Sequence, residues 1–242
     1  MDKKLLVLNW KINPATPKAA LALAKASDIS GMVVVPPFVY IQEVKKILKK
    51  AQLGAQDLFG SNDMQAATGE ISGTELKNLG VTYVIVGHSE RRHTLGETDA
   101  IVARKMQAAS EIGLTPILCV GETKAEKDAG EREEVLKRQL ETGLSLIFLR
   151  GKPPVEIIIA YEPVWAIGNG NPEEPASAAA TMSFIKQFVI ERYHVQPRML
   201  YGGSVTSQNI ADYLNYKEVD GALIGGASLK ASEVKKCAAL IK

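Results

Sequence analysis

The chain has 242 residues with 29 basic and 27 acidic side chains, and so a formal net charge of +2. The two signs of charge are interspersed, which gives no indication of a nucleic-acid or membrane partner. The apolar run Leu5–Leu8 is shorter than the roughly 7–15 apolar residues of a signal-peptide core, and no stretch reaches membrane-spanning length. We therefore expect a cytoplasmic protein, with Cys119 and Cys237 as buried free thiols.

Short apolar, β-rich runs alternate with segments of helical periodicity along the whole chain. The predicted strands span residues 5–8, 32–35, 53–56, 83–86, 116–120, 156–161, 198–201 and 222–224. The clearest helical segments span residues 18–26, 41–50, 101–112, 133–148, 178–193 and 232–241. The strands are apolar on both faces, which is typical of parallel strands covered by helices, and no Pro- or Ser-rich linker divides the series. The alternation predicts a single α/β domain over residues 1–242, a (β/α)8 barrel, with a doubly wound open sheet as the alternative.

Residues suited to chemistry follow five of the predicted strands. In chain order they are Asn9-Trp10-Lys11, Gly87-His88-Ser89-Glu90-Arg91-Arg92, Tyr161-Glu162, Gly202-Gly203-Ser204 and Gly225-Gly226. In a (β/α)8 barrel the functional groups lie on the loops after the C-terminal ends of the strands. We therefore expect these five segments to converge on one mouth of the barrel.

Glu162 stands at the end of an apolar strand and is followed by Pro163, which favours extended geometry in the residue before it. The next residues, Val164-Trp165-Ala166-Ile167, form an apolar loop that indicates a lid. A hydrophobic cover would raise the pKa of the Glu162 carboxyl and exclude water from its reaction. The pattern predicts a general base beneath a lid, with a strand-end salt bridge as the alternative.

The glycine pairs after the last two predicted strands suggest a phosphate site. Backbone N–H groups of glycines approach a dianion closely, and barrel phosphate sites are common at these loops. Ser204, Gly225 and Gly226 are the candidate phosphate-binding residues, and Gly168 in the lid adds an N–H on closure. Simple turns are the alternative for either pair alone. The three histidines show no metal-ligand spacing, so we expect no metal.

Taken together and in this order, the five motifs resemble triosephosphate isomerase. The resemblance runs from about residue 5 to residue 235 and implies the TIM barrel of that family. It further implies a cofactor-free homodimer that interconverts dihydroxyacetone phosphate and D-glyceraldehyde 3-phosphate through an enediol(ate), a step of glycolysis and gluconeogenesis.

The same resemblance implies a role for each polar residue. Glu162 is the base, and His88 acts on the carbonyl and enediolate oxygens as a neutral imidazole whose pKa a helix N-terminus depresses. Lys11 places a cation beside the substrate oxygens, and Asn9 orients these groups through hydrogen bonds. Glu90 fits two roles equally well, an active-site acid or a structural ion-pair anchor.

Two segments bear on assembly and lid motion. Residues 57–73 are long for a barrel loop; in family members this loop enters the partner subunit, and Thr68-Gly69-Glu70 matches its contact sequence. We expect Leu58, Phe59 and Met64 to be exposed there as a partner surface. The family's lid commonly continues Gly-Thr-Gly-Lys, whereas this chain has Gly168-Asn169-Gly170-Asn171-Pro172, which predicts different opening kinetics.

Two other functions compete with this interpretation. A phosphate-binding barrel enzyme with a Schiff-base lysine would need a lysine at an inner strand end, and Lys11 is the candidate. A catalytically silent phosphate-binding or scaffold protein would lack at least one of Glu162, His88 and Lys11, all of which are present.

Overall fold

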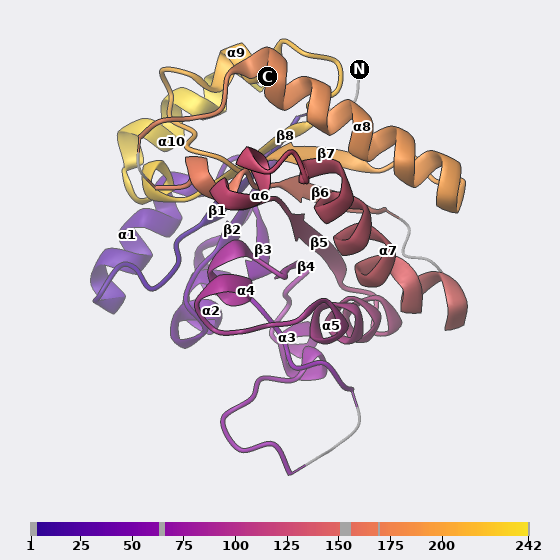
Figure 1. Cartoon of the computed structure of the whole chain (residues 1–242). Helices are drawn as coiled ribbons and strands as arrows, with labels where there is room; N and C mark the ends of the chain where they lie inside the picture. Colours follow the sequence, from indigo (N-terminus) through magenta and orange to yellow (C-terminus); the bar gives the residue numbers. More distant parts are fainter. Residues whose placement is uncertain (1–3, 63–65, 151–155, 169, 242) are drawn as a thin grey trace.

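The computed structural model describes residues 4–62, 66–150, 156–168 and 170–241. Within these residues eight parallel strands form a closed barrel in chain order, and the eighth strand pairs with the first (Figure 1). The strands are β1 (Leu5–Asn9), β2 (Met32–Val35), β3 (Gln52–Ala55), β4 (Tyr83–Val86), β5 (Thr115–Val120), β6 (Ile158–Tyr161), β7 (Arg198–Tyr201) and β8 (Gly221–Ile224). The closed order confirms the predicted (β/α)8 barrel and excludes the open sheet.

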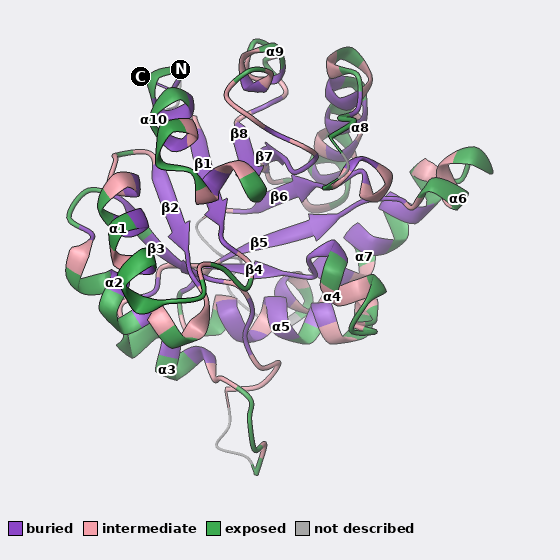
Figure 2. Cartoon of the chain, turned by 90° about the vertical axis from the view of Figure 1, so that its left-hand side faces the viewer, coloured by how far each residue is buried: buried purple, intermediate pink, exposed green. Residues whose placement is uncertain are grey.

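Helices connect the strands and cover the outside of the barrel, with their exposed faces turned to solvent (Figure 2). The longer helices are α1 (Pro17–Ser27), α2 (Ile41–Ile47), α5 (Asp99–Glu111), α7 (Arg132–Arg150), α8 (Pro175–Tyr193) and α10 (Ala231–Ala239). The shorter helices are α3 (Gly73–Asn78), α4 (Ser89–His93), α6 (Lys124–Asp128) and α9 (Ile210–Leu214). The three 3-10 turns of the described residues are η1 (Phe38–Tyr40), η2 (Val164–Ala166) and η3 (Gly226–Leu229).

Helix α2 ends earlier than the periodicity predicts. Leu48 has an extended backbone. The Asp28 carboxylate accepts the N–H groups of Lys49, Lys50 and Ala51, at 2.9, 2.6 and 2.9 Å. These three bonds hold the chain in a turn, so it enters β3 at Gln52 instead of continuing the helix.

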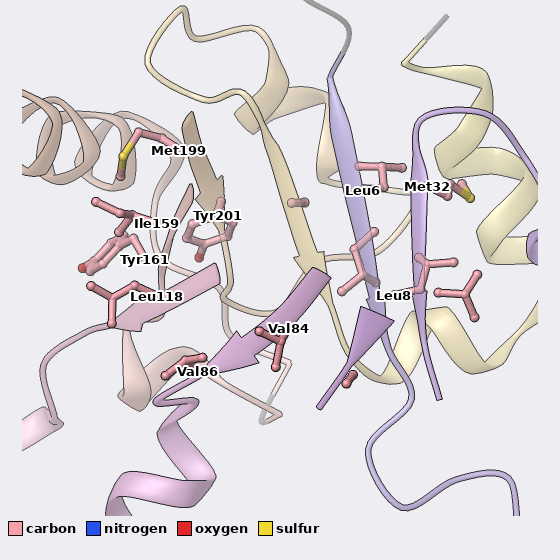
Figure 3. Close-up of a cluster of buried hydrophobic side chains, with 14 of the residues drawn as sticks. Leu6, Leu8, Met32, Val84, Val86, Leu118, Ile159, Tyr161, Met199 and Tyr201 are labelled. Atoms are coloured by element: carbon pink, nitrogen blue, oxygen red, sulfur yellow. The ribbon is translucent and has the colours of Figure 1, made fainter. Parts of the chain in front are cut away.

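Side chains of each strand alternate between the barrel interior and an outer layer beneath the helices. On β1, Leu5 and Val7 belong to the interior cluster, while Leu6 and Leu8 belong to the outer one (Figure 3). Asn9 continues the inward set at the C-terminal end of the strand. The alternation therefore directs a polar side chain into the mouth of the barrel.

The loop after β3 extends away from the body of the barrel (Figure 1). Leu58 is only 1% exposed and belongs to the outer core cluster, so the prediction that it is exposed was wrong. Its side chain packs close to Gly73, the first residue of α3, and the barrel layers do have room for it. Phe59 is half-buried, Met64 lies outside the described residues, and Thr68 is exposed.

Both cysteines are buried and free, as the sequence predicts. Cys119 lies on β5 and faces the barrel interior, and Cys237 lies on α10 against the outer layer. Across the described ranges, none of the helices has the length and apolar character that crossing a bilayer requires.

Candidate active site

A pocket of about 210 Å³ lies at the mouth formed by the C-terminal ends of the strands. Its lining includes every predicted site residue except Glu90: Asn9, Lys11, His88, Glu162, Gly168, Ser204, Gly225 and Gly226. These residues end or follow β1, β4, β6, β7 and β8, and Glu90 adjoins the pocket through an ion pair with Lys11. A hollow of about 730 Å³ at the opposite end of the strands contains none of them.

Glu162 is held in place by two donors from the loop after β4. One carboxylate oxygen, Oε2, accepts the Ser89 N–H at 2.9 Å, and Oε1 lies 3.0 Å from His88 Nε2. The side chain is 2% exposed. A Cβ atom on Gly202 would lie 2.8 Å from Glu162 Cγ, so glycine lets the chain after β7 pass this close to the side chain of Glu162.

The pKa of Glu162 lies below its ordinary value of 4.5 in this arrangement. Burial alone would raise the pKa, but the attraction of His88, the hydrogen bonds from His88 and the Ser89 N–H, and Lys11 outweigh it. The prediction that the lid raises the pKa was therefore wrong for this conformation. The donors that meet the carboxylate outweigh the effect of its burial.

His88 caps the N-terminus of α4 with its ring. Nδ1 accepts the Glu90 N–H at 3.3 Å, so the proton of a neutral imidazole resides on Nε2 and is directed at Glu162. Burial lowers the pKa of His88, but Glu162 and Glu90 outweigh burial and raise it above 6.5. The depressed pKa implied by the resemblance is thus not found while Glu162 contacts the ring.

Asn9 and Lys11 form a compact turn after β1. Lys11 has a φ of 52°, in the region that residues other than glycine seldom adopt. Asn9 Oδ1 accepts the backbone N–H of Lys11 at 3.0 Å, and the side-chain amide of Gln56 donates to the backbone carbonyl of Lys11 at 2.6 Å. The Lys11 ammonium pairs with the half-exposed carboxylate of Glu90. The sequence alone did not identify Gln56 as a site residue. Its position at the end of the predicted third strand is the feature that could have identified it.

The other end of the pocket has the features of an anion site. Gly225 and Gly226 precede and begin η3, and a Cβ atom on Gly226 would meet nothing within 4 Å. The Ser204 hydroxyl donates to the carbonyl of Ala166 in the lid at 2.7 Å. A helical turn that begins at glycine beside a fixed ammonium suits a phosphate group. Ser204 therefore joins the phosphate end of the pocket to the lid.

The lid, residues 163–172, contributes Ile167, Gly168 and Gly170 to the pocket lining. Gly168 and Gly170 have φ values of 72° and 76°, whereas Asn169 lies outside the described residues. Trp165 does not line the pocket; its indole N–H donates to Glu122 at 2.9 Å. The apolar cover near Glu162 is thus Ile167 rather than the tryptophan.

No group of three or more His, Cys, Asp or Glu side chains in the described residues is arranged to hold a metal ion. The chemistry of the site rests on a buried carboxylate, an imidazole and an ammonium at the mouth of a closed barrel. These groups define a barrel enzyme of the acid–base class, acting on a small anionic substrate.

Comparison with known proteins specifies the family. The profile described as triosephosphate isomerase matches residues 4–241. A protein named triosephosphate isomerase from Delftia acidovorans is 42% identical, over 96% of each chain. Proteins of the same name from Dictyoglomus thermophilum and Moorella thermoacetica are 40% and 42% identical, over 95% and 96% of this chain and 96% of their own lengths. The chain belongs to the triosephosphate isomerase family.

The electrostatics of Glu162 generate a prediction about pH. Because its folded-state pKa is lowered, its contribution to stability is present above pH 4.5 and is lost as pH falls through the folded-state pKa. We expect the carboxyl ¹³C resonance of Glu162, assigned with Glu162→Gln, to titrate below pH 4.5. In His88→Gln the midpoint should move upward, because the largest opposing attraction is gone.

His93→Gln is the matched control, since His93 is exposed on the same helix. A wild-type midpoint above 4.5, or equal midpoints in His88→Gln and the wild type, would contradict this account of Glu162.

Proposed function

We propose that the chain interconverts dihydroxyacetone phosphate and D-glyceraldehyde 3-phosphate as a cytoplasmic enzyme of glycolysis and gluconeogenesis. The observation that carries this proposal is the placement of Glu162 within 3.0 Å of His88 Nε2, in a pocket that also contains Lys11 and Gly226. The reaction moves a proton between adjacent carbons, so it needs one base over two carbons and one donor beside two oxygens.

Glu162 turns from the Ser89 N–H toward the substrate and removes a proton from C1 of dihydroxyacetone phosphate. The electron pair moves into a C1–C2 double bond and the carbonyl π pair moves onto the C2 oxygen, which takes the proton of His88 Nε2. His88 Nε2 then takes the hydroxyl proton from the C1 oxygen, so the ring ends neutral and C1 becomes the aldehyde carbon as C2 is protonated. Glu162 then returns the proton to C2, which gives D-glyceraldehyde 3-phosphate. Lys11 stabilises the developing negative charge, and Asn9 holds the turn that positions Lys11.

The movement of Glu162 changes the pKa of both groups in the useful direction. Away from Ser89 and His88, the carboxylate loses the contacts that lower its pKa, and burial then makes it a stronger base. His88 loses the contact with Glu162, the largest effect that raises its pKa, and burial favours the neutral ring. The resting contact between the two residues thus stores the base in a less basic form until substrate binds.

The phosphate group is assigned to Ser204, Gly225 and Gly226, with the Gly168 N–H as a further donor when the lid closes. Ile167 lies over the same pocket and excludes water from the reacting carbons. Glu90 is assigned as the partner that holds Lys11, because its carboxylate forms an ion pair with the ammonium. Glu90 therefore acts on the substrate through Lys11.

A homodimer is the second part of this proposal. Ile12, Val39 and Leu95 follow β1, β2 and β4, at the same mouth as the loop after β3, and are 91%, 80% and 63% exposed. Exposed apolar side chains grouped on neighbouring loops favour a partner surface. We assign this surface to a second copy related by a two-fold axis. The Lys11 turn lies directly beside Ile12, so association would also stabilise the active site.

The direct test of the isomerase proposal is turnover with D-glyceraldehyde 3-phosphate in an assay that detects dihydroxyacetone phosphate. We expect rapid turnover by the wild type and a loss of about 10²–10⁴-fold in Glu162→Gln, because an amide cannot accept the proton. Binding of inorganic phosphate should persist in this variant. More than a tenth of wild-type activity in Glu162→Gln would rule out Glu162 as the base, and borohydride trapping of Lys11 would favour a Schiff-base enzyme.

Light scattering tests the homodimer. We expect a wild-type mass of twice the 26.1 kDa of one chain, and a concentration-dependent fall toward one chain in Val39→Lys. Leu149→Lys is the control, because the exposed fraction of Leu149, 77%, is close to the 80% of Val39, whereas Leu149 lies on α7. A wild-type mass of 26.1 kDa with full specific activity would refute the dimer.

A further inference from the structure

A charged cluster lies behind the active site, on the outer side of β6. Glu122 and Glu173 are 0% and 2% exposed, and Arg132 contacts both carboxylates. Arg132 Nε lies 3.0 Å from Glu122 Oε1, and Nη2 lies 2.9 Å from Glu173 Oε1. The cluster does not contact the pocket, and the proposed chemistry does not use it.

The cluster holds both ends of the lid. At the N-terminal end, Trp165 donates to Glu122, and the ammonium of Lys127 lies 3.2 Å from the centre of the indole ring. At the C-terminal end, the backbone N–H of Glu173 donates to the Tyr201 hydroxyl at 3.1 Å. The backbone carbonyl of Glu173 accepts a hydrogen bond from the Tyr213 hydroxyl. One group of side chains therefore fixes the points between which the lid can move.

Tyr161 connects this cluster to the catalytic strand. Its hydroxyl lies 2.9 Å from Glu173 Oε2 and 3.2 Å from each carboxylate oxygen of Glu122. Burial and the two carboxylates raise the pKa of this phenol far above its ordinary value, so it keeps its single proton. Tyr161 immediately precedes Glu162 and points into the outer layer beside Ile159 (Figure 3). A shift of the phenol thus displaces the backbone of the base.

The position of Arg132 indicates a role beyond helix stability. It is the first residue of α7, where the helix dipole disfavours a cation. Two carboxylates, one phenolic proton and one indole N–H share the cluster, and Arg132 is the cation that contacts both carboxylates. Without it, two buried carboxylates would be left with neutral donors, namely the Tyr161 hydroxyl, the Trp165 indole N–H and the Ser177 hydroxyl.

We propose that Arg132 and Glu173 are positioning residues whose buried ion pair anchors the C-terminal end of the lid to α7 and, through Tyr161, holds the backbone of Glu162. This inference rests on the proposed isomerase function. In this role the pair determines where the base lies and where the lid can move, and neither residue contacts substrate.

The test compares Arg132→Gln, Glu173→Gln and the double variant. Arg132→Gln leaves two carboxylates without their shared cation, so we expect kcat to fall by about 10- to 100-fold, the scale of a misplacement of about 1 Å. KM should change by less than about threefold, because the phosphate end of the pocket is untouched. The double variant should lose about as much kcat as Arg132→Gln alone, because either change already breaks the ion pair between Arg132 and Glu173.

The lid is monitored independently by ¹⁹F NMR of protein labelled with 5-fluorotryptophan. The chain has two tryptophans, and the resonance that disappears in Trp165→Phe belongs to Trp165. The Trp165 resonance should broaden or split in Arg132→Gln and change to a similar extent in the double variant. Glu174→Gln is the control, because Glu174 is exposed, caps α8 and lies outside the cluster. Melting temperatures separate a fall in kcat from a loss of folded protein.

Additive losses of kcat in the double variant, or a Trp165 resonance that Arg132→Gln leaves unchanged, would overturn the anchoring role and leave the isomerase function standing. Absence of turnover in the wild type, by contrast, would refute the isomerase function on which the inference rests.

Discussion

The pairing of β8 with β1 is the constraint on which the site depends. It aligns Leu5 with Gly221 and Leu8 with Ile224, and it makes neighbours of the first and last strands. A Cβ atom on Gly221 would run into the carbonyl of Leu5, so glycine permits the seam to close. At the mouth, closure brings Gly225 beside Lys11, where a Cβ atom would lie 3.4 Å from Lys11 Cε. In an open sheet the ammonium and the glycine-rich loop would stand at separate edges.

The strand order and the mouth of the barrel could be predicted because they depend on local patterns. Apolar runs bounded by polar or glycine residues mark parallel strands, and strand ends mark functional loops. Helices of five or six residues, such as α4 and α9, were missed because they are shorter than the window in which helical periodicity can be recognised. Yet α4 supplies the Ser89 N–H that holds Glu162.

The charge balance of the site could not be predicted in the same way. The pKa of Glu162 depends on His88, Ser89 and Lys11, which lie on two other loops, and only the folded chain gives their distances. Leu58 shows the same limitation, since its place in the core depends on packing beside Gly73. The ion pair between Arg132 and Glu173 joins positions 41 residues apart, and neither residue stands in a recognisable motif. Composition and spacing identify the residue types, whereas their energies follow from contacts between distant segments.

The stability of the resting site and the reactivity of the base oppose each other. Contacts with Ser89 and His88 lower the pKa of the Glu162 carboxyl, and they must be exchanged for contacts with substrate before a proton can move. The lid and the outer cluster behind β6 limit where the strand end and the lid can go during that exchange. Burial then acts in the direction that proton abstraction needs, because it is the largest effect that raises the pKa of Glu162.

The central claim is that Glu162 carries a proton between two carbons of the substrate. It is tested most directly by converting dihydroxyacetone phosphate in D₂O, trapping the aldehyde product at once, and measuring deuterium at C2 by NMR. A carboxyl group that exchanges its proton with solvent during the lifetime of the enediol(ate) predicts deuterium at C2 in a substantial part of the product. Product with only protium at C2, at every extent of conversion, would show that the transferred hydrogen never passes through an exchanging group, and would contradict the account.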